Sequence, residues 1–253
     1  MALPKKVDTT LYSHILRRSI TWYQNYVKSI GGCRKSKSWD NVLKSVFQRL
    51  MNASGSPSFK IQYCITPSMQ FNAAAFPGGQ FIINIGTLKY LEKKVQLAIK
   101  GKKKKESSNK IREQYIVGIL AHELAHYYNK HTLKGIKKSW SLKKNQLVEK
   151  DLGLIKHTQN MELDADYTGF LIMQKAGYKP SDMVLTLETL NEIYQSCLKK
   201  HQCSSAIYFS SHPAPHRRLA KVKHGKQQLH KWLYKIEKAF TDVSFGRKLK
   251  ESD

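Results

Sequence analysis

The chain has few acidic residues. Of its 253 residues, 18 are aspartate or glutamate and 44 are lysine or arginine, so the formal net charge is +26. An excess of this size favours anionic partners such as nucleic acid or a membrane surface, and it carries no information about the fold. The lysines are spread along the chain rather than interleaved with aromatic residues, and no RNA- or DNA-binding motif occurs, so we do not expect nucleic acid to be the partner.

Cysteines are also sparse. The four that occur are Cys33, Cys64, Cys197 and Cys203. No pair has the C-x-x-C spacing of a structural zinc or redox site, which excludes both on sequence grounds. Cys197 and Cys203 could form a disulfide, but we expect buried or free thiols, which are usual in an intracellular chain.

Long hydrophobic runs are missing as well. No stretch approaches the ~18 consecutive apolar residues that span a membrane, so we expect any membrane attachment to be peripheral. The hydrophobic content of 41% and aromatic content of 10% are those of a globular protein. A chain of this length can bury one sizeable core.

One apolar stretch carries a metal-binding pattern. Residues 114–121 contain no proline and lead directly into His122-Glu123-Leu124-Ala125-His126, and Ser107 to Asn109 offer a helix cap upstream. On a helix, His122 and His126 leave the same face and can bind one metal ion. Glu123 lies beside them, where its carboxylate can handle a proton without binding the metal. Two hydrogen-bonded core histidines are the structural alternative.

A second helix supplies the missing ligand. Residues 160–173 have a helical pattern that ends at Gly177 and Pro180. A catalytic zinc site with two histidines needs a third protein ligand, and Glu162 provides a carboxylate for it. Asp166 lies one turn further on, where it can accept the free ring N–H of a ligating histidine. A solvated acidic face is the alternative, but acids are rare in this chain.

These residues, with three further segments, resemble a family of zinc metallopeptidases of the gluzincin type. The family includes the CAAX prenyl protease, the HtpX heat-shock protease and the mitochondrial overlapping-activity protease. Its N-A-x-x-x-P-G-G segment matches residues 72–79, its E-x-x-A-D matches 162–166, and its H-P-x-x-x-x-R-[I/L] matches 212–219. The four segments occur in the family's order and cover roughly residues 58–220.

The resemblance implies roles for several of the matched residues. It implies one Zn²⁺ per chain, polypeptide substrates, and a substrate-binding strand and loop at Asn72, Pro77, Gly78 and Gly79, although the two glycines could mark only a turn. It further implies that His212 donates a hydrogen bond to the oxyanion formed during peptide hydrolysis. The matched Arg218 could orient the loop that carries His212 or pair with a carboxylate of the site.

The predicted fold is α+β, mainly helical, with a small antiparallel sheet beside the metal-binding helix. Alternating apolar residues predict strands at 59–65 and 81–85. We expect a helical segment over residues 1–55, a metallopeptidase domain over 56–245 and a tail over 246–253. The basic, acid-poor start is compatible with a mitochondrial targeting segment or with an ordinary packed helix.

The sequence therefore predicts a zinc metalloendopeptidase. Glu123 is expected to act as proton shuttle, and a mitochondrial, inner-membrane-associated location is expected, with a peripheral cytoplasmic one as the alternative. His131 and His157 are not expected to bind the metal, because a continued helix would turn them away from it. The competing function is a basic protein that binds nucleic acid or anionic membrane and keeps a structural metal site, but such a site has no need of Glu123.

Overall fold

The computed structural model describes residues 9–55, 61–100, 107–134 and 158–200, together with residues 212, 215, 216, 218 and 219. The predicted tail at 246–253, Cys203 and His157 lie outside the described residues. The elements of the described part, in chain order, are α1 (Thr9–Ser29), α2 (Asp40–Ser54), β1 (Gln62–Thr66), β2 (Ala73–Ala75), β3 (Gln80–Asn84), α3 (Ile85–Lys100), α4 (Ser108–Tyr128), α6 (Gln159–Lys175) and α7 (Pro180–Lys200).

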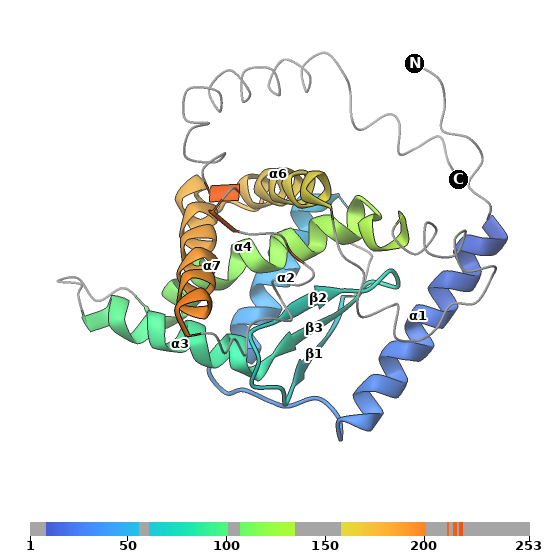
Figure 1. The fold of residues 1–253 in the computed structure, drawn as a ribbon, viewed down its shortest axis with the longest axis horizontal. Coiled ribbons are helices and arrows are strands. Elements are labelled where there is room, and N and C mark those ends of the chain that lie inside the picture. The colour runs from blue at the N-terminus through green and yellow to red at the C-terminus, as the bar shows by residue number, and fades with distance from the viewer. Residues whose placement is uncertain are drawn as a thin grey trace, which may run out of the picture.

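Helix α4 is the centre of the structure (Figure 1). It contacts α2, α3, α6, α7 and β2, and every residue from Ile116 to His126 is buried. The Ser107 side chain caps it by accepting a hydrogen bond from the Lys110 N–H, as the sequence predicts. A helix that is buried on most sides is apolar on most sides, so the polar residues near its end have to be satisfied by neighbouring elements.

Two glycines allow helices to approach α4 closely. A Cβ atom at Gly169 of α6 would lie 2.9 Å from the backbone oxygen of Ala121. A Cβ atom at Gly118 would lie 2.2 Å from Thr186 Oγ1 of α7. A larger residue at either position would push the helices apart, and at Gly169 it would move α6 away from the histidines of α4.

The sheet has three strands in the order β1-β3-β2. Strands β2 and β3 are antiparallel, with Ala74 opposite Ile82, whereas β1 is parallel to β3, with Cys64 opposite Ile82. The α+β class is confirmed, but the sheet is mixed and not antiparallel throughout. After β1 the chain passes over the position of β3 and forms β2 first. Strand β3 then returns between β1 and β2, antiparallel to β2 and parallel to β1. Strand β2 is left at the edge next to α4.

Helix α1 covers the outer face of the sheet (Figure 1). Its Tyr23 packs in an apolar cluster with Cys64, Phe76 and Ile82. A disulfide between Cys33 and Cys64 ties the segment after α1 to β1, with a Cα–Cα distance of 5.1 Å. The expectation of free thiols is therefore wrong for this pair. Their 31-residue separation gave no signal in the sequence, because only the packing of α1 on the sheet brings them together.

None of the helices within the described ranges is both long and apolar enough to cross a membrane.

Candidate metal centre

The imidazoles of His122 and His126 face each other on successive turns of α4. Their Nε2 atoms are 2.9 Å apart, and both side chains are buried. Each ring points its Nδ1 atom away from this meeting point, towards a different neighbour. The i, i+4 spacing thus brings two nitrogen lone pairs to one place, as expected from the sequence.

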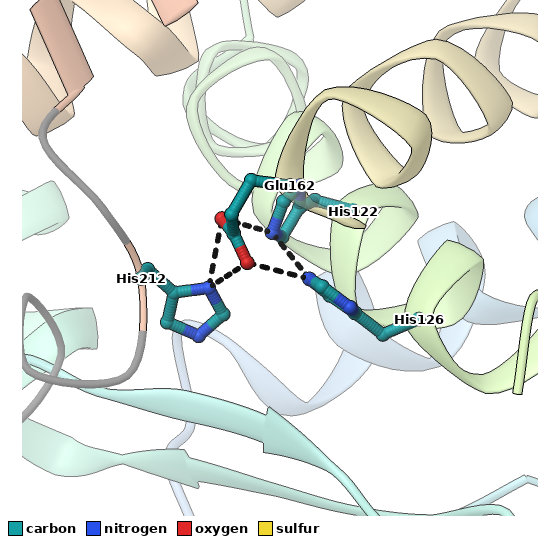
Figure 2. Close-up of side chains that lie close together, drawn as sticks. All are labelled: His122, His126, Glu162 and His212. Carbon is teal, nitrogen blue, oxygen red and sulfur yellow. Dashed lines mark hydrogen bonds and ion pairs between the residues drawn. The ribbon is translucent and has the colours of Figure 1, made fainter. Parts of the chain in front are cut away.

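Glu162 of α6 completes the group from the other side (Figure 2). Its Oε2 atom lies 3.3 Å from His122 Nε2, and its Oε1 atom lies 3.1 Å from His126 Nε2. The His212 ring closes the group, with Nδ1 3.0 Å from Glu162 Oε1. Each of the four side chains offers a ligand atom, and these atoms all lie within 4.8 Å of one another.

Asp166 and Arg218 lie directly behind His122. The Asp166 Oδ1 atom is 2.9 Å from His122 Nδ1, so that the ring can donate to the carboxylate. Arg218 donates to Asp166 through Nε at 2.8 Å and Nη2 at 2.6 Å, and its Nη1 lies 3.0 Å from Glu162 Oε2. Burial opposes the charge on Asp166, but Arg218 and the His122 hydrogen bond hold the pKa of this carboxyl below its usual value. Arg218 thereby joins two acids of α6.

His131 lies behind His126, which the sequence did not predict. Its Nδ1 atom is 3.0 Å from His126 Nδ1, and its Nε2 atom is 3.0 Å from Asp164 Oδ2. It is not one of the four clustered residues, and the expectation that it does not bind the metal stays a prediction. The reasoning behind that expectation is wrong, because α4 ends at Tyr128 and the chain turns back before His131. The sequence carries no clear signal for this turn, because the left-handed residue is a lysine.

Glu123 is placed next to the group without belonging to it. The Ala75 N–H of β2 donates to its Oε2 atom at 3.2 Å, and its buried Oε1 atom accepts no hydrogen bond within the described part of the chain. The His212 Nε2 atom is 3.7 Å from that Oε1. Burial raises the pKa of Glu123 above its ordinary value, against the charges of His212 and His122. A raised pKa suits a carboxylate that both takes and returns a proton near neutral pH.

The charges of the group attract a cation. Burial and the charge of Arg218 lower the pKa of His122. Glu162 and Asp166 raise it by a larger amount, so that the net pKa is about 9. Burial likewise opposes the charge on Glu162, yet His212 and His122 hold the pKa of this carboxyl well below its usual value. Two imidazoles and an ionised carboxylate whose ligand atoms converge on one point form a set of donors suited to zinc. His122, His126 and Glu162 would hold the ion.

The predicted substrate segment forms the β2–β3 turn. The Gly79 N–H donates to Phe76 O at 2.9 Å, and Gly79 has a φ of 76°, so Pro77, Gly78 and Gly79 build a tight turn that ends in a left-handed residue. Asn72 bonds Thr87 Oγ1 through its backbone N–H and C=O, which anchors the start of β2. Pro77 also lines a cavity of about 140 Å³ beside the metal group. The other lining residues are Phe76, His126, Tyr127, Tyr128, Lys130, Thr132 and Leu133.

Comparison with known proteins agrees with this geometry. Residues 38–160 and 146–226 match peptidase family M48. The mitochondrial metalloendopeptidase OMA1 of Saccharomyces cerevisiae is 25% identical over 148 residues, which are 49% of this chain and 38% of that protein. The beta-barrel assembly-enhancing protease of Escherichia coli K12 is 20% identical over 212 residues, which are 74% of this chain and 39% of that protein. Because the family match extends over most of the sequence, the chain belongs to peptidase family M48.

Proposed function

We propose that the protein is a zinc-dependent endopeptidase with one Zn²⁺ per chain, held by His122, His126 and Glu162. The observation that supports this best is the position of Glu123. A structural metal site has no use for a buried carboxylate that faces the ligands and binds none of them, whereas hydrolysis needs a proton carrier there. The same observation disfavours the alternative of a basic binding protein with a structural metal.

Different residues of the chain carry out different steps of the proposed reaction. A zinc ion in this site would lower the pKa of a water molecule and polarise the scissile carbonyl. Glu123 takes the proton of the attacking water on Oε1 and passes it to the leaving amine, while the Ala75 N–H holds its other oxygen. His212 donates a hydrogen bond to the oxyanion, because its ring faces both Glu123 and Glu162.

Strand β2 and the neighbouring cavity would hold the substrate. The hydrogen bonds of Asn72 O and Phe76 N to β3 leave the backbone groups of Ala73 and Ala75 pointing away from β3 by the alternation of a strand. The Ala75 N–H donates to Glu123, so the Ala73 N–H and C=O and the Ala75 C=O are the groups offered to a substrate. An extended polypeptide could pair with this edge through backbone hydrogen bonds, so that recognition would depend more on the substrate's backbone than on its sequence. The cavity that follows Phe76 and Pro77 is largely aromatic, so we infer that it takes an apolar side chain of the substrate.

The setting of the reaction is inferred from the relatives and from the charge. One relative is described as mitochondrial, and we propose that this chain acts in protein quality control or processing of membrane-associated proteins at the mitochondrial inner membrane. The net charge of +26 would support peripheral contact with anionic lipid. Flotation with phosphatidylserine vesicles should show binding that falls steeply as salt rises. Tight binding of an oligonucleotide without vesicle binding would argue against the membrane and for nucleic acid.

The test of the function compares Glu123→Gln with the unchanged protein, both purified with measured zinc content. We expect equal zinc in the two proteins and a loss of casein cleavage of about 10²–10⁴-fold in the variant, because the substitution removes the proton carrier and no ligand. Near-normal turnover in the zinc-loaded variant would rule out the mechanism. Equal zinc with no cleavage by either protein would favour a structural metal site.

A further inference from the structure

Three acids lie in the first two turns of α6, and the structure gives each one a different partner. Glu162 faces the metal position directly. Asp166 holds Nδ1 of His122. Asp164, the remaining acid, lies 3.0 Å from the ring of His131, a residue that does not belong to the metal group. The proposed function explains the first two and leaves Asp164 and His131 without a role.

We propose that His131 and Asp164 are positioning residues for His126, as Asp166 and Arg218 are for His122. The proposal rests on the metal site inferred above. In this arrangement His126 Nδ1–H donates to His131 Nδ1, and His131 Nε2–H donates to Asp164 Oδ2, each over 3.0 Å. A neutral imidazole has one donor and one acceptor, so these two bonds fix the tautomers of both rings. The lone pair of His126 Nε2 is then directed at the metal position.

The backbone is shaped to bring His131 back to His126. Helix α4 ends at Tyr128, and Lys130 follows with a φ of 55°, the one positive φ at a residue other than glycine in the described ranges. Its N–H still bonds Tyr127 O at 3.0 Å. A left-handed conformation is unfavourable for lysine, so the surrounding structure has to maintain it. This turn reverses the chain and places His131 against the last turn of α4.

Asn129 secures the outer end of the relay. Its side-chain nitrogen donates to Asp164 Oδ2 at 3.1 Å and to Thr168 Oγ1 at 2.9 Å, so it links the end of α4 to α6. The His131 side chain is 2% exposed and that of Asp164 is 53% exposed. Water can therefore replace part of the contribution of Asp164, and we expect a smaller effect from its loss than from loss of His131.

A purely structural role for His131 would be to fill space under the last turn of α4. Two substitutions separate the roles. His131→Leu keeps a side chain of similar volume and removes the acceptor for His126. His131→Asn is smaller but can keep an acceptor oxygen near the position of the lost Nδ1. If His131 only fills space, the leucine variant should be closer to the unchanged protein. If His131 positions His126, the asparagine variant should be closer.

The first measurement is zinc affinity, determined by competition with a chromogenic chelator. We expect His131→Leu to weaken zinc binding by about 10–100-fold, the usual effect of losing a group that orients a ligand. We expect His131→Asn to restore most of that loss, and Asp164→Asn to cost less than His131→Leu. Unchanged affinity in His131→Leu would overturn the proposal, as would equal losses in both variants that parallel the melting temperature of the metal-free proteins.

The second measurement reads the tautomer of His126 without metal or substrate. Nitrogen-15 NMR of the metal-free protein should show His126 protonated at Nδ1, and a mixture of tautomers in His131→Leu. Protonation at Nε2 alone in the unchanged protein would contradict the relay. Neither measurement uses peptide cleavage. A protein that binds zinc through a positioned His126 and cuts no polypeptide would refute the proposed function and leave this inference intact.

Discussion

The two halves of α4 have contrasting surroundings. From Ile111 to Ala121 the helix packs apolar side chains against α2, α3 and α7. From His122 onwards it is just as buried, but its side chains face charged groups of α6 and the segment that carries His212 and Arg218. One half is stabilised by packing, and the other carries the groups that we propose to bind the metal and move protons.

The contrast shows that the residues that fix the fold and the residues with reactive side chains occupy different parts of one helix. The apolar half fixes where α4 lies, and the close contact at Gly169 fixes how near α6 approaches. The polar half then depends on charge complementarity, because each buried ion there has a partner. Substitutions in the two halves should therefore affect different measurements.

The largest difference is expected between Leu120→Ala and His126→Ala. Leu120 is buried in the apolar core, and its truncation should lower the free energy of unfolding by about 2–5 kcal/mol while the folded protein keeps its zinc. His126→Ala should lose the metal and the activity while the melting temperature of the metal-free protein changes little. Chemical unfolding and zinc analysis on both variants check this. Full zinc in His126→Ala would remove His126 from the proposed ligand set.

His212→Ala tests the polar half from the side of the substrate. We expect kcat to fall by about 10²–10³-fold with zinc content retained, because the oxyanion loses its donor. Steady-state kinetics on zinc-loaded protein gives this value. Weaker zinc binding in the variant would instead identify His212 as a fourth ligand, which its distance to Glu162 also allows. A lowered melting temperature with normal kcat would make it a packing residue.

Asp166→Asn should have an intermediate effect. The substitution keeps the shape of the side chain and removes the charge that pairs with Arg218 and the acceptor for His122. Zinc affinity or turnover should fall by about 10–100-fold, with no ligand lost. Chelator competition is the direct measurement. An unchanged affinity and rate would show that Asp166 only stabilises its helix.

The last prediction concerns protons. His122 has a pKa of about 9 in the metal-free protein, so it is charged at pH 7 and has to lose a proton to bind zinc. Apparent zinc affinity should therefore rise about tenfold per pH unit until pH 9. Because this pKa is raised on folding, the charge on His122 stabilises the metal-free protein below about pH 6.5, and that contribution is lost as the pH rises through 9. Calorimetry in buffers of different ionisation enthalpy should show one proton released, and a buffer-independent enthalpy would contradict it.

Local patterns in the sequence were sufficient for much of the fold and of the site. Spacing on α4 predicted that His122 and His126 meet, and Ser107 and Gly177 marked helix ends where the structure has them. Each of these signals acts within a few residues along the chain.

What the sequence did not predict depends on how distant segments pack. The parallel pairing of β1 with β3 follows from the order in which strands are laid down, and the Cys33–Cys64 bond from the position of α1. The contact of His131 with His126 was not predicted, because the left-handed residue Lys130 ends the helical periodicity that set the expected direction of His131. Its carboxylate partner Asp164 comes from another helix, so no spacing rule connects the two.

The most direct test of the central claim is to measure metal content and polypeptide cleavage on the same sample before and after chelation. The proposed function predicts one zinc per chain, cleavage that disappears when the metal is removed, and recovery on addition of one equivalent of zinc. Cleavage that persists in protein shown to be free of metal would contradict it.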